Sequence, residues 1–385
     1  MTSTAAFPTA TPERPSGRSF LLDLLKAVGC VLIVLHHLAF YGPMSDVVLR
    51  QWPGVIDWLS EYGRLAVQLF LVCSGYLTAA ALGGRPEMDG PRVLRLAGRR
   101  YLRLSIPLMG ALSAAVLVTE WIRPGFDHPS LSAVPDWTQT VAHVFFLQHL
   151  AEMEALSAGV WYVAIDFQLY MITLLALWAV TLWARTQPLW RPDALRLQVM
   201  LGLTVVSLLR WNLNHDLDLY GLYFFGAYGM GWLAHRARQS RIPPKGWAVL
   251  VVLGLLALWV DPRWRITTAW GVALLLAAAP EGWLAPAVLR GWRAAVSQLS
   301  RMSYSVFLIH YAASLAVSAV ITRHFPDSLA WNAAGMGIAL GLSIAVGSGL
   351  YRLTEQPRQT LRLWGLWAAV FVASAALAMH WAAGA

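Results

Sequence analysis

The chain has 385 residues, of which 58% are hydrophobic and only 13% are charged, and its mean hydropathy is +0.54. This composition excludes an ordinary soluble domain and is typical of a polytopic membrane protein. The net charge of +9 is spread over short segments between apolar runs. It therefore indicates membrane topology and no nucleic-acid partner.

The predicted elements begin with a polar, proline-rich stretch at 1–18, which has too few large apolar side chains to order by itself and predicts a disordered tail. One membrane domain follows at 19–361, and an additional transmembrane or interfacial helix is predicted at 362–385. Apolar runs approaching the ~20 residues that cross a hydrocarbon core lie at 19–41, 64–83, 103–122, 160–183, 197–210, 218–235, 246–260, 267–284, 303–322, 331–351 and 363–381.

These runs predict an all-α transmembrane helix bundle with ten or eleven spans, because two runs are short and the last could lie flat on the membrane. Residues 139–150 are predicted as a re-entrant or interfacial helix. With the N-terminus inside, 21 arginines and lysines fall on the inner side and seven on the outer side. Positive residues are retained on the cytoplasmic side, so we expect a cytoplasmic N-terminus.

Two polar residues in the first run point to chemistry. Lys26 and His37 are separated by ten residues, which places them on one helix face and about 16 Å apart along the axis. His36 faces about 100° away from His37. An ionisable residue inside a span is costly and indicates function, so we expect His37 to share a cavity with Lys26 and to act as a general base on a hydroxyl.

Arginines cluster before the third run. Arg95, Arg99 and Arg103 recur at four-residue spacing and share one helix face, and Arg100 lies beside them. Their density on the inner side indicates phosphate binding, although topology signalling alone is the alternative.

Asp166 is the only carboxylate deep in a predicted run. A buried carboxylate requires a partner, and we expect this to be Lys26, Arg64 or His37. His310, as a lone histidine in its run, is predicted either to form a helix–helix hydrogen bond or to belong to the site. Ser74, Gly75 and Tyr76 are predicted to allow close helix packing, since small residues let membrane helices approach.

Six stretches resemble, in order, the motifs of acyltransferase family 3, a family of integral membrane acyltransferases, and together they span about residues 19–361. They are "LLDLLKAVGCVLIVLHHLAFYG", "VQLFLVCSGYL", "RRYLRLSIPL", "WYVAIDFQLY" (with Trp161 and Tyr170 at its ends), "MSYSVFLIHY" and "TEQPRQTL" (with Glu355). The chain departs from the family pattern where Lys26 replaces arginine and Asp166 replaces glutamate. Both changes keep the charge but alter its reach.

The resemblance implies transfer of an acyl group, commonly acetyl, with succinyl as an alternative, from cytoplasmic acyl-CoA to a hydroxyl of a glycan or lipid-linked saccharide of the cell envelope. It implies a location in the bacterial inner membrane, in contact with lipid, and no permanently bound cofactor. His37, Lys26 and Asp166 would be catalytic, Arg95, Arg99, Arg100 and Arg103 would bind the donor, and Ser74, Tyr76, Trp161, Tyr170, His310 and Glu355 would have structural or substrate roles.

The competing interpretation is a proton-coupled transporter or lipid flippase in which Asp166, His37 and His310 form a proton relay. That class favours inverted repeats, and the two halves of the sequence show no convincing repeat. The sequence contains no phosphate-binding glycine loop and no cysteine–histidine spacing typical of a metal site. It leaves open the acceptor, direct or covalent transfer, and the oligomeric state.

Overall fold

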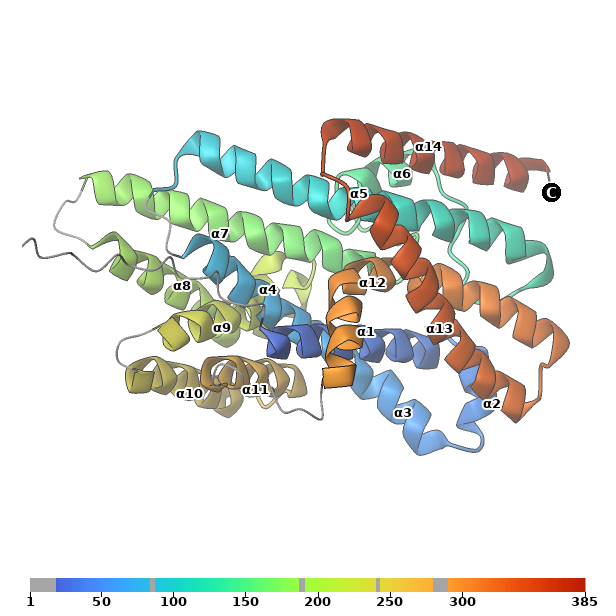
Figure 1. Ribbon diagram of the computed structural model, residues 1–385, viewed down its shortest axis with the longest axis horizontal. Helices are drawn as coiled ribbons and strands as arrows, with labels where there is room; N and C mark the ends of the chain where they lie inside the picture. Colours follow the sequence, from blue (N-terminus) through green and yellow to red (C-terminus); the bar gives the residue numbers. More distant parts are fainter. Residues whose placement is uncertain (1–18, 84–86, 187–190, 240–242, 280–289, 385) are drawn as a thin grey trace, which may run out of the picture.

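Helices account for 83% of the computed structural model, which describes residues 19–83, 87–186, 191–239, 243–279 and 290–384. No strand occurs within these ranges, so the all-α prediction is confirmed for them. The predicted tail at 1–18 lies outside the described residues. The α-helices (Figure 1) are α1 (Phe20–Phe40), α2 (Met44–Leu49), α3 (Pro53–Tyr62), α4 (Ala66–Leu82), α5 (Gly90–Ile122), α6 (Trp137–Val144), α7 (Val160–Thr186), α8 (Pro192–Leu209), α9 (Gly221–Gln239), α10 (Pro243–Val260), α11 (Trp264–Ala278), α12 (Arg290–His324), α13 (Leu329–Thr354) and α14 (Leu361–Gly384).

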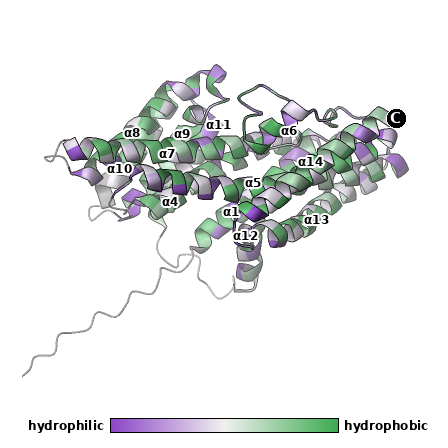
Figure 2. Ribbon diagram, turned by 90° about the horizontal axis from the view of Figure 1, so that it is seen from above, coloured by the Kyte–Doolittle hydropathy of each residue, from purple (hydrophilic) through white to green (hydrophobic). Residues whose placement is uncertain are grey.

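Each of the eleven predicted apolar runs coincides with one of these helices, but the predicted count of spans is not confirmed. Among the described residues, eight helices are long and apolar enough to cross a membrane, and two further apolar helices, Gly246–Val260 and Trp264–Ala278, are shorter. Hydrophobic residues, coloured green, recur along the helical ribbons in Figure 2, as expected for helices that cross a membrane. The additional helix predicted at 362–385 corresponds to α14, which packs on α5.

The arginine-rich stretch belongs to the same helix as the apolar run that follows it. We expected the apolar run only from residue 103, and α5 extends it back to Gly90, so that Arg95, Arg99 and Arg103 lie on one continuous helix. Asp89 caps it by accepting a hydrogen bond from the Arg92 backbone N–H at 2.8 Å, and Pro91 occupies the first turn, where its missing N–H costs nothing. The arginines are therefore held on a rigid element.

Helices α1 and α12 form a parallel pair joined by hydrogen bonds along their length. Asp23 accepts from the hydroxyls of Ser297 and Ser300 at 3.0 and 2.8 Å. Further along, Lys26 Nζ donates to the Ser300 carbonyl at 2.9 Å. Beyond these, Cys30 approaches the Ser303 carbonyl and His37 approaches His310. The partners stay 273 to 277 residues apart in sequence, which fixes both the direction and the register of the pair.

The segment between α5 and α7 returns deep into the bundle. Tyr101, near the start of α5, donates its hydroxyl hydrogen to the Val144 carbonyl at 2.9 Å, and its ring lies 5.3 Å from that of Phe146. Since α5 ends 21 residues later at Ile122, the chain has travelled back about 30 Å along it. The helix predicted at 139–150 corresponds in part to the short α6, which packs against α5 and α14.

Buried His143 holds this returning segment together. Its Nδ1–H donates to the Gln139 carbonyl at 2.8 Å, and its Nε2 accepts from the Leu156 backbone N–H at 3.2 Å. Burial lowers the pKa of His143 from 6.5 to about 4, opposed by the hydrogen bond to Gln139. Protonation would place an N–H of the ring against the N–H of Leu156.

Helices α4 and α9 approach so closely that only glycine fits at their crossing. A Cβ on Gly75 would lie 1.9 Å from the Tyr228 carbonyl oxygen, and one on Gly231 would lie 2.0 Å from the Val72 carbonyl oxygen. This matches the close helix packing predicted for the stretch around Gly75. Because both obstacles are backbone, neither can move without separating the helices.

We expect Gly75→Ala or Gly231→Ala to lower the free energy of unfolding by about 1–3 kcal/mol or more, as overpacking does. Denaturant titration of the purified protein in mixed micelles measures this. Gly337→Ala, on an exposed face of α13 with open space around it, is the matched control. An unchanged midpoint in both crossing variants would contradict the packing described.

We also expect acidification to loosen residues 137–159. The unfolded segment binds more protons than the folded one between pH 6.5 and about 4, so stability falls as pH decreases across this window. The slope is about 1.4 kcal/mol per pH unit at most. Hydrogen exchange of the Leu156 amide at pH 5 and 7.5, corrected for its intrinsic rate, measures the effect, and His143→Asn should abolish it.

Candidate active site

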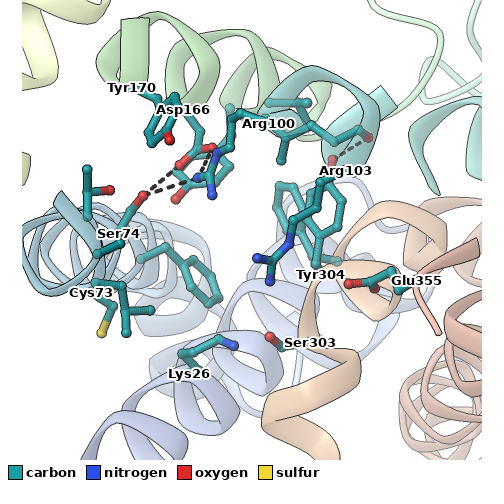
Figure 3. Close-up of a pocket in the computed structure, with 18 of the residues that line it drawn as sticks. Lys26, Cys73, Ser74, Arg100, Arg103, Asp166, Tyr170, Ser303, Tyr304 and Glu355 are labelled. Carbon is teal, nitrogen blue, oxygen red and sulfur yellow. Dashed lines mark hydrogen bonds and ion pairs between the residues drawn. The ribbon is translucent and has the colours of Figure 1, made fainter. Parts of the chain in front are cut away.

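A cavity of about 380 Å³ lies between α1, α4, α5, α7 and α12. Its lining is strongly cationic, and the charged side chains come from helices far apart in the sequence (Figure 3). The close-up shows Lys26 and Ser303 on one side of the cavity, Asp166, Arg100 and Ser74 on the other, and Arg103 and Glu355 toward a third. The charged lining residues are Lys26, Arg99, Arg100, Arg103, Arg301, Asp166 and Glu355.

Arg100 is the partner of Asp166. Its Nη2 lies 2.5 Å from Asp166 Oδ2, and Ser74 donates to Asp166 Oδ1 at 2.8 Å. The guanidinium also stands over the Tyr170 ring, 5.3 Å from its centroid. The prediction that Asp166 pairs with Lys26, Arg64 or His37 is wrong, because α7 runs antiparallel to α5 and presents Asp166 to the arginine-rich turn. Asp166 therefore holds an arginine in place.

Glu355 occupies the opposite wall, directly after α13. The Ser305 hydroxyl donates to its Oε1 at 2.5 Å. Burial raises the pKa of the Glu355 carboxyl, while Ser305, Arg103 and Lys26 oppose that rise. Glu355 thus lies in the field of two of the cations that line the cavity.

The two adjacent histidines of α1 face different neighbours. His36 Nδ1 lies 3.1 Å from the Leu59 carbonyl oxygen of α3. His37 Nδ1 lies 2.7 Å from His310 Nε2 on α12, and the two rings stack with centroids 4.8 Å apart. Both His37 and His310 are buried. The prediction that His37 shares the cavity of Lys26 is wrong for the cavity described, because its lining includes Lys26 and not His37.

The hydrogen bonds of the histidine pair assign its tautomers. His310 Nδ1 contacts the Phe307 backbone carbonyl, which can only accept, so this nitrogen carries a proton. In a neutral ring, His310 Nε2 is then an acceptor, and His37 Nδ1–H must be the donor. His37 Nε2 is left with a lone pair. The pair therefore presents a base whose ring is fixed by a second histidine.

The other residues singled out from the sequence divide between cavity and surroundings. Arg99, Arg100, Arg103, Ser74 and Tyr170 line the cavity, whereas Arg95 is exposed on α5 outside it. Two more lie outside the lining: Tyr76 packs its ring on His235, and Trp161 packs on Phe224.

Sequence reasoning did not single out Arg301, Tyr304 or three further aromatic lining residues, Phe307, Phe70 and Tyr162. Arg301 precedes the apolar run expected at 303–322, whereas α12 begins at Arg290 and carries Arg301 on the same helix. The three-residue spacing of Arg301, Tyr304 and Phe307 is helical and could have indicated a common face. The remaining two, Phe70 and Tyr162, carried no signal that separates them from ordinary core residues.

Comparison with known proteins identifies the chain. A protein-family model described as an acyltransferase domain matches residues 21–348, which is most of the chain and includes every charged cavity residue except Glu355. No curated protein and no solved structure is significantly similar to it. The helical, apolar architecture and the extent of this match show that the chain belongs to acyltransferase family 3.

Proposed function

We propose that this protein is an O-acyltransferase that moves an acyl group from cytoplasmic acyl-CoA to a hydroxyl of a glycan or related cell-envelope acceptor, with His37 as the general base. The observation that carries the proposal is the hydrogen bond between His37 and His310, which leaves His37 Nε2 as an acceptor. A general base must hold a lone pair within hydrogen-bond reach of the proton that it takes, so the orientation of the ring matters.

The cationic cavity supports acyl-CoA as the donor. Five cationic side chains face two carboxylates there, so the cavity as a whole favours an anion. Arg100 is already bound to Asp166, which leaves the phosphate contacts to Arg99, Arg103 and Arg301. Arginine suits this role because its planar guanidinium can bind a phosphate through two parallel hydrogen bonds.

The reaction needs no covalent enzyme intermediate. His37 Nε2 takes the proton of the acceptor hydroxyl as its oxygen attacks the thioester carbonyl, and a tetrahedral intermediate forms. The carbon–sulfur bond then breaks, the acyl group stays on the acceptor oxygen as an ester, and the thiolate of CoA takes the proton from His37. His310 accepts the Nδ1–H hydrogen bond throughout, so it stabilises the transient imidazolium and acts as a positioning residue.

The α1–α12 pair carries both the cavity and the base. Lys26 lines the cavity and donates to the Ser300 carbonyl, and His37 and His310 lie about 16 Å further along the same two helices. We place the beginning of both helices on the cytoplasmic side of the bacterial inner membrane, because the arginines gather at that end. CoA would then bind from the cytoplasm and the acceptor would approach from the outer side.

We expect His37→Ala to lower acyl transfer by about 10²- to 10⁴-fold, the usual contribution of a general base. Mass spectrometry of surface, periplasmic and lipid-linked glycans, from cells with matched amounts of folded protein, would show an alkali-labile acyl mass that disappears in the variant. His36→Ala is the control, since it removes the neighbouring imidazole from the same helix. Equal acylation by wild type and His37→Ala would refute the assignment of the base.

His310→Gln should cause a smaller loss than His37→Ala and should alter the pH–rate profile, because a glutamine amide can still accept a hydrogen bond from His37 but cannot share its charge. The profile of initial rates between pH 5.5 and 9 measures this. A profile identical to that of wild type would leave His310 with only a structural role.

We expect Arg99→Ala and Arg103→Ala each to weaken binding of free CoA by about tenfold, in line with the loss of a charge-assisted hydrogen bond. Calorimetry in detergent at two salt concentrations measures both the affinity and its salt dependence. Arg95→Ala is the matched control, since Arg95 is on the same helix and outside the cavity. Equal affinities for all three variants would reject these arginines as phosphate ligands.

A further inference from the structure

The cavity ends in aromatic rings on the side of the histidine pair. On each of α4, α7 and α12, the lining residue nearest to the histidines is aromatic. These residues are Phe70 on α4, Tyr162 on α7 and Phe307 on α12. The direction along α12 is fixed by its register with α1, because Ser300 is level with Lys26 and His310 is level with His37. The charged lining residues lie toward the other end.

These three rings are in mutual contact. The centroids of Phe70 and Tyr162 are 6.1 Å apart, those of Phe70 and Phe307 6.3 Å, and those of Tyr162 and Phe307 5.7 Å. Such separations are direct ring contacts. The rings therefore form a continuous apolar end wall, with no room for a polymethylene chain between them in this arrangement.

Glycines hold the wall close to the surrounding backbone. A Cβ on Gly29 of α1 would lie 3.1 Å from the Phe70 ring. Gly159 has a φ of +81°, and a Cβ there would lie 2.8 Å from Phe307 Cζ and 3.7 Å from His37 Cε1. The tip of the Phe307 ring and the His37 ring thus contact the same glycine. Phe307 also packs on His310, with centroids 6.1 Å apart, so it is the wall residue between cavity and base.

We infer that Phe307, together with Phe70 and Tyr162, sets the length of the acyl chain that this site accepts. This inference rests on the proposed function. Acyl-CoA is a linear molecule whose phosphates stay with the arginines, so its acyl group is the leading tip that enters the cavity. Because the rings lie between the cavity and His37, the tip of the acyl group meets them first, and each additional methylene between the tip and the carbonyl holds the carbonyl further from His37.

The wall should select sharply for short, uncharged acyl groups. A single methylene more or less in an apolar pocket changes discrimination by about 10- to 200-fold. The Phe307 side chain can be shortened without removing its backbone carbonyl, which is the group that binds His310 Nδ1. Chain-length selection is therefore separable from positioning of the base.

Binding of CoA thioethers with ethyl, butyl and hexyl groups tests the inference in purified full-length protein, because these probes cannot react and need no acceptor. We expect wild type to bind S-hexyl-CoA at least tenfold more weakly than S-ethyl-CoA. Phe307→Ala should bring the ratio of the two dissociation constants close to one, and Phe307→Leu should give an intermediate ratio. Phe225→Ala, which removes a comparably buried ring from α9 outside the cavity, should leave the ratio as in wild type.

The outcomes distinguish failure of the chain-length inference from failure of the proposed acyl-CoA donor. If wild type binds all three thioethers and the ratio is unchanged in folded Phe307→Ala, Phe307→Leu and Phe70→Leu, the end wall does not measure chain length and the inference is overturned. If wild type binds none of them, the acyl-CoA donor itself is wrong and the inference falls with it. If the short probe binds and the long one gains affinity only in the wall variants, the inference stands.

Discussion

The site depends on the parallel pairing of α1 with α12. These helices are far apart in sequence, yet side chains from Asp23 to His37 find partners on α12 at a nearly constant offset of 273 to 277 residues. In a membrane, apolar faces give little preference for one neighbour over another, since lipid is as apolar as leucine, and polar contacts with small residues decide which helices meet. The hydrogen-bonded pair therefore fixes at once where the cavity lies and which histidine accompanies His37.

The buried polar groups form two units that are physically distinct. The carboxylate of Asp166 is neutralised by Arg100 and further satisfied by Ser74, so the cost of removing its charge from water is offset locally. The histidine pair is satisfied without any counter-charge, through a chain of hydrogen bonds that ends on the Phe307 carbonyl. One unit holds a cation toward the cavity and the other holds a lone pair on His37. In the proposed function, binding of an anion and abstraction of a proton would therefore fall to separate parts of the bundle.

Much of the architecture could be predicted from the sequence, because apolar runs, capping residues and arginine clusters are local signals. The common face of Lys26 and His37, and that of Arg99 and Arg103, follow from helical periodicity alone. The pairing of Asp166 with Arg100 could not be predicted, since it depends on which helices are neighbours. The same holds for His37 with His310. The end wall of Phe70, Tyr162 and Phe307 could not be predicted from the sequence. An aromatic residue in an apolar run gives the same sequence pattern whether its side chain faces lipid, the protein core or a substrate.

If the site holds a thioester, as proposed, the position of the end wall has a consequence for the competing reaction with water. If bulk water reached an imidazole base beside a thioester, the thioester would be hydrolysed. Water would then compete with the acceptor hydroxyl for the same base. Here the rings close the solvent-accessible cavity before the histidines, and the returning segment brings Gly159 against the His37 ring from another side. Exclusion of water from a reacting centre suppresses such side reactions. The packing that surrounds the His37 ring therefore also keeps water away from the base.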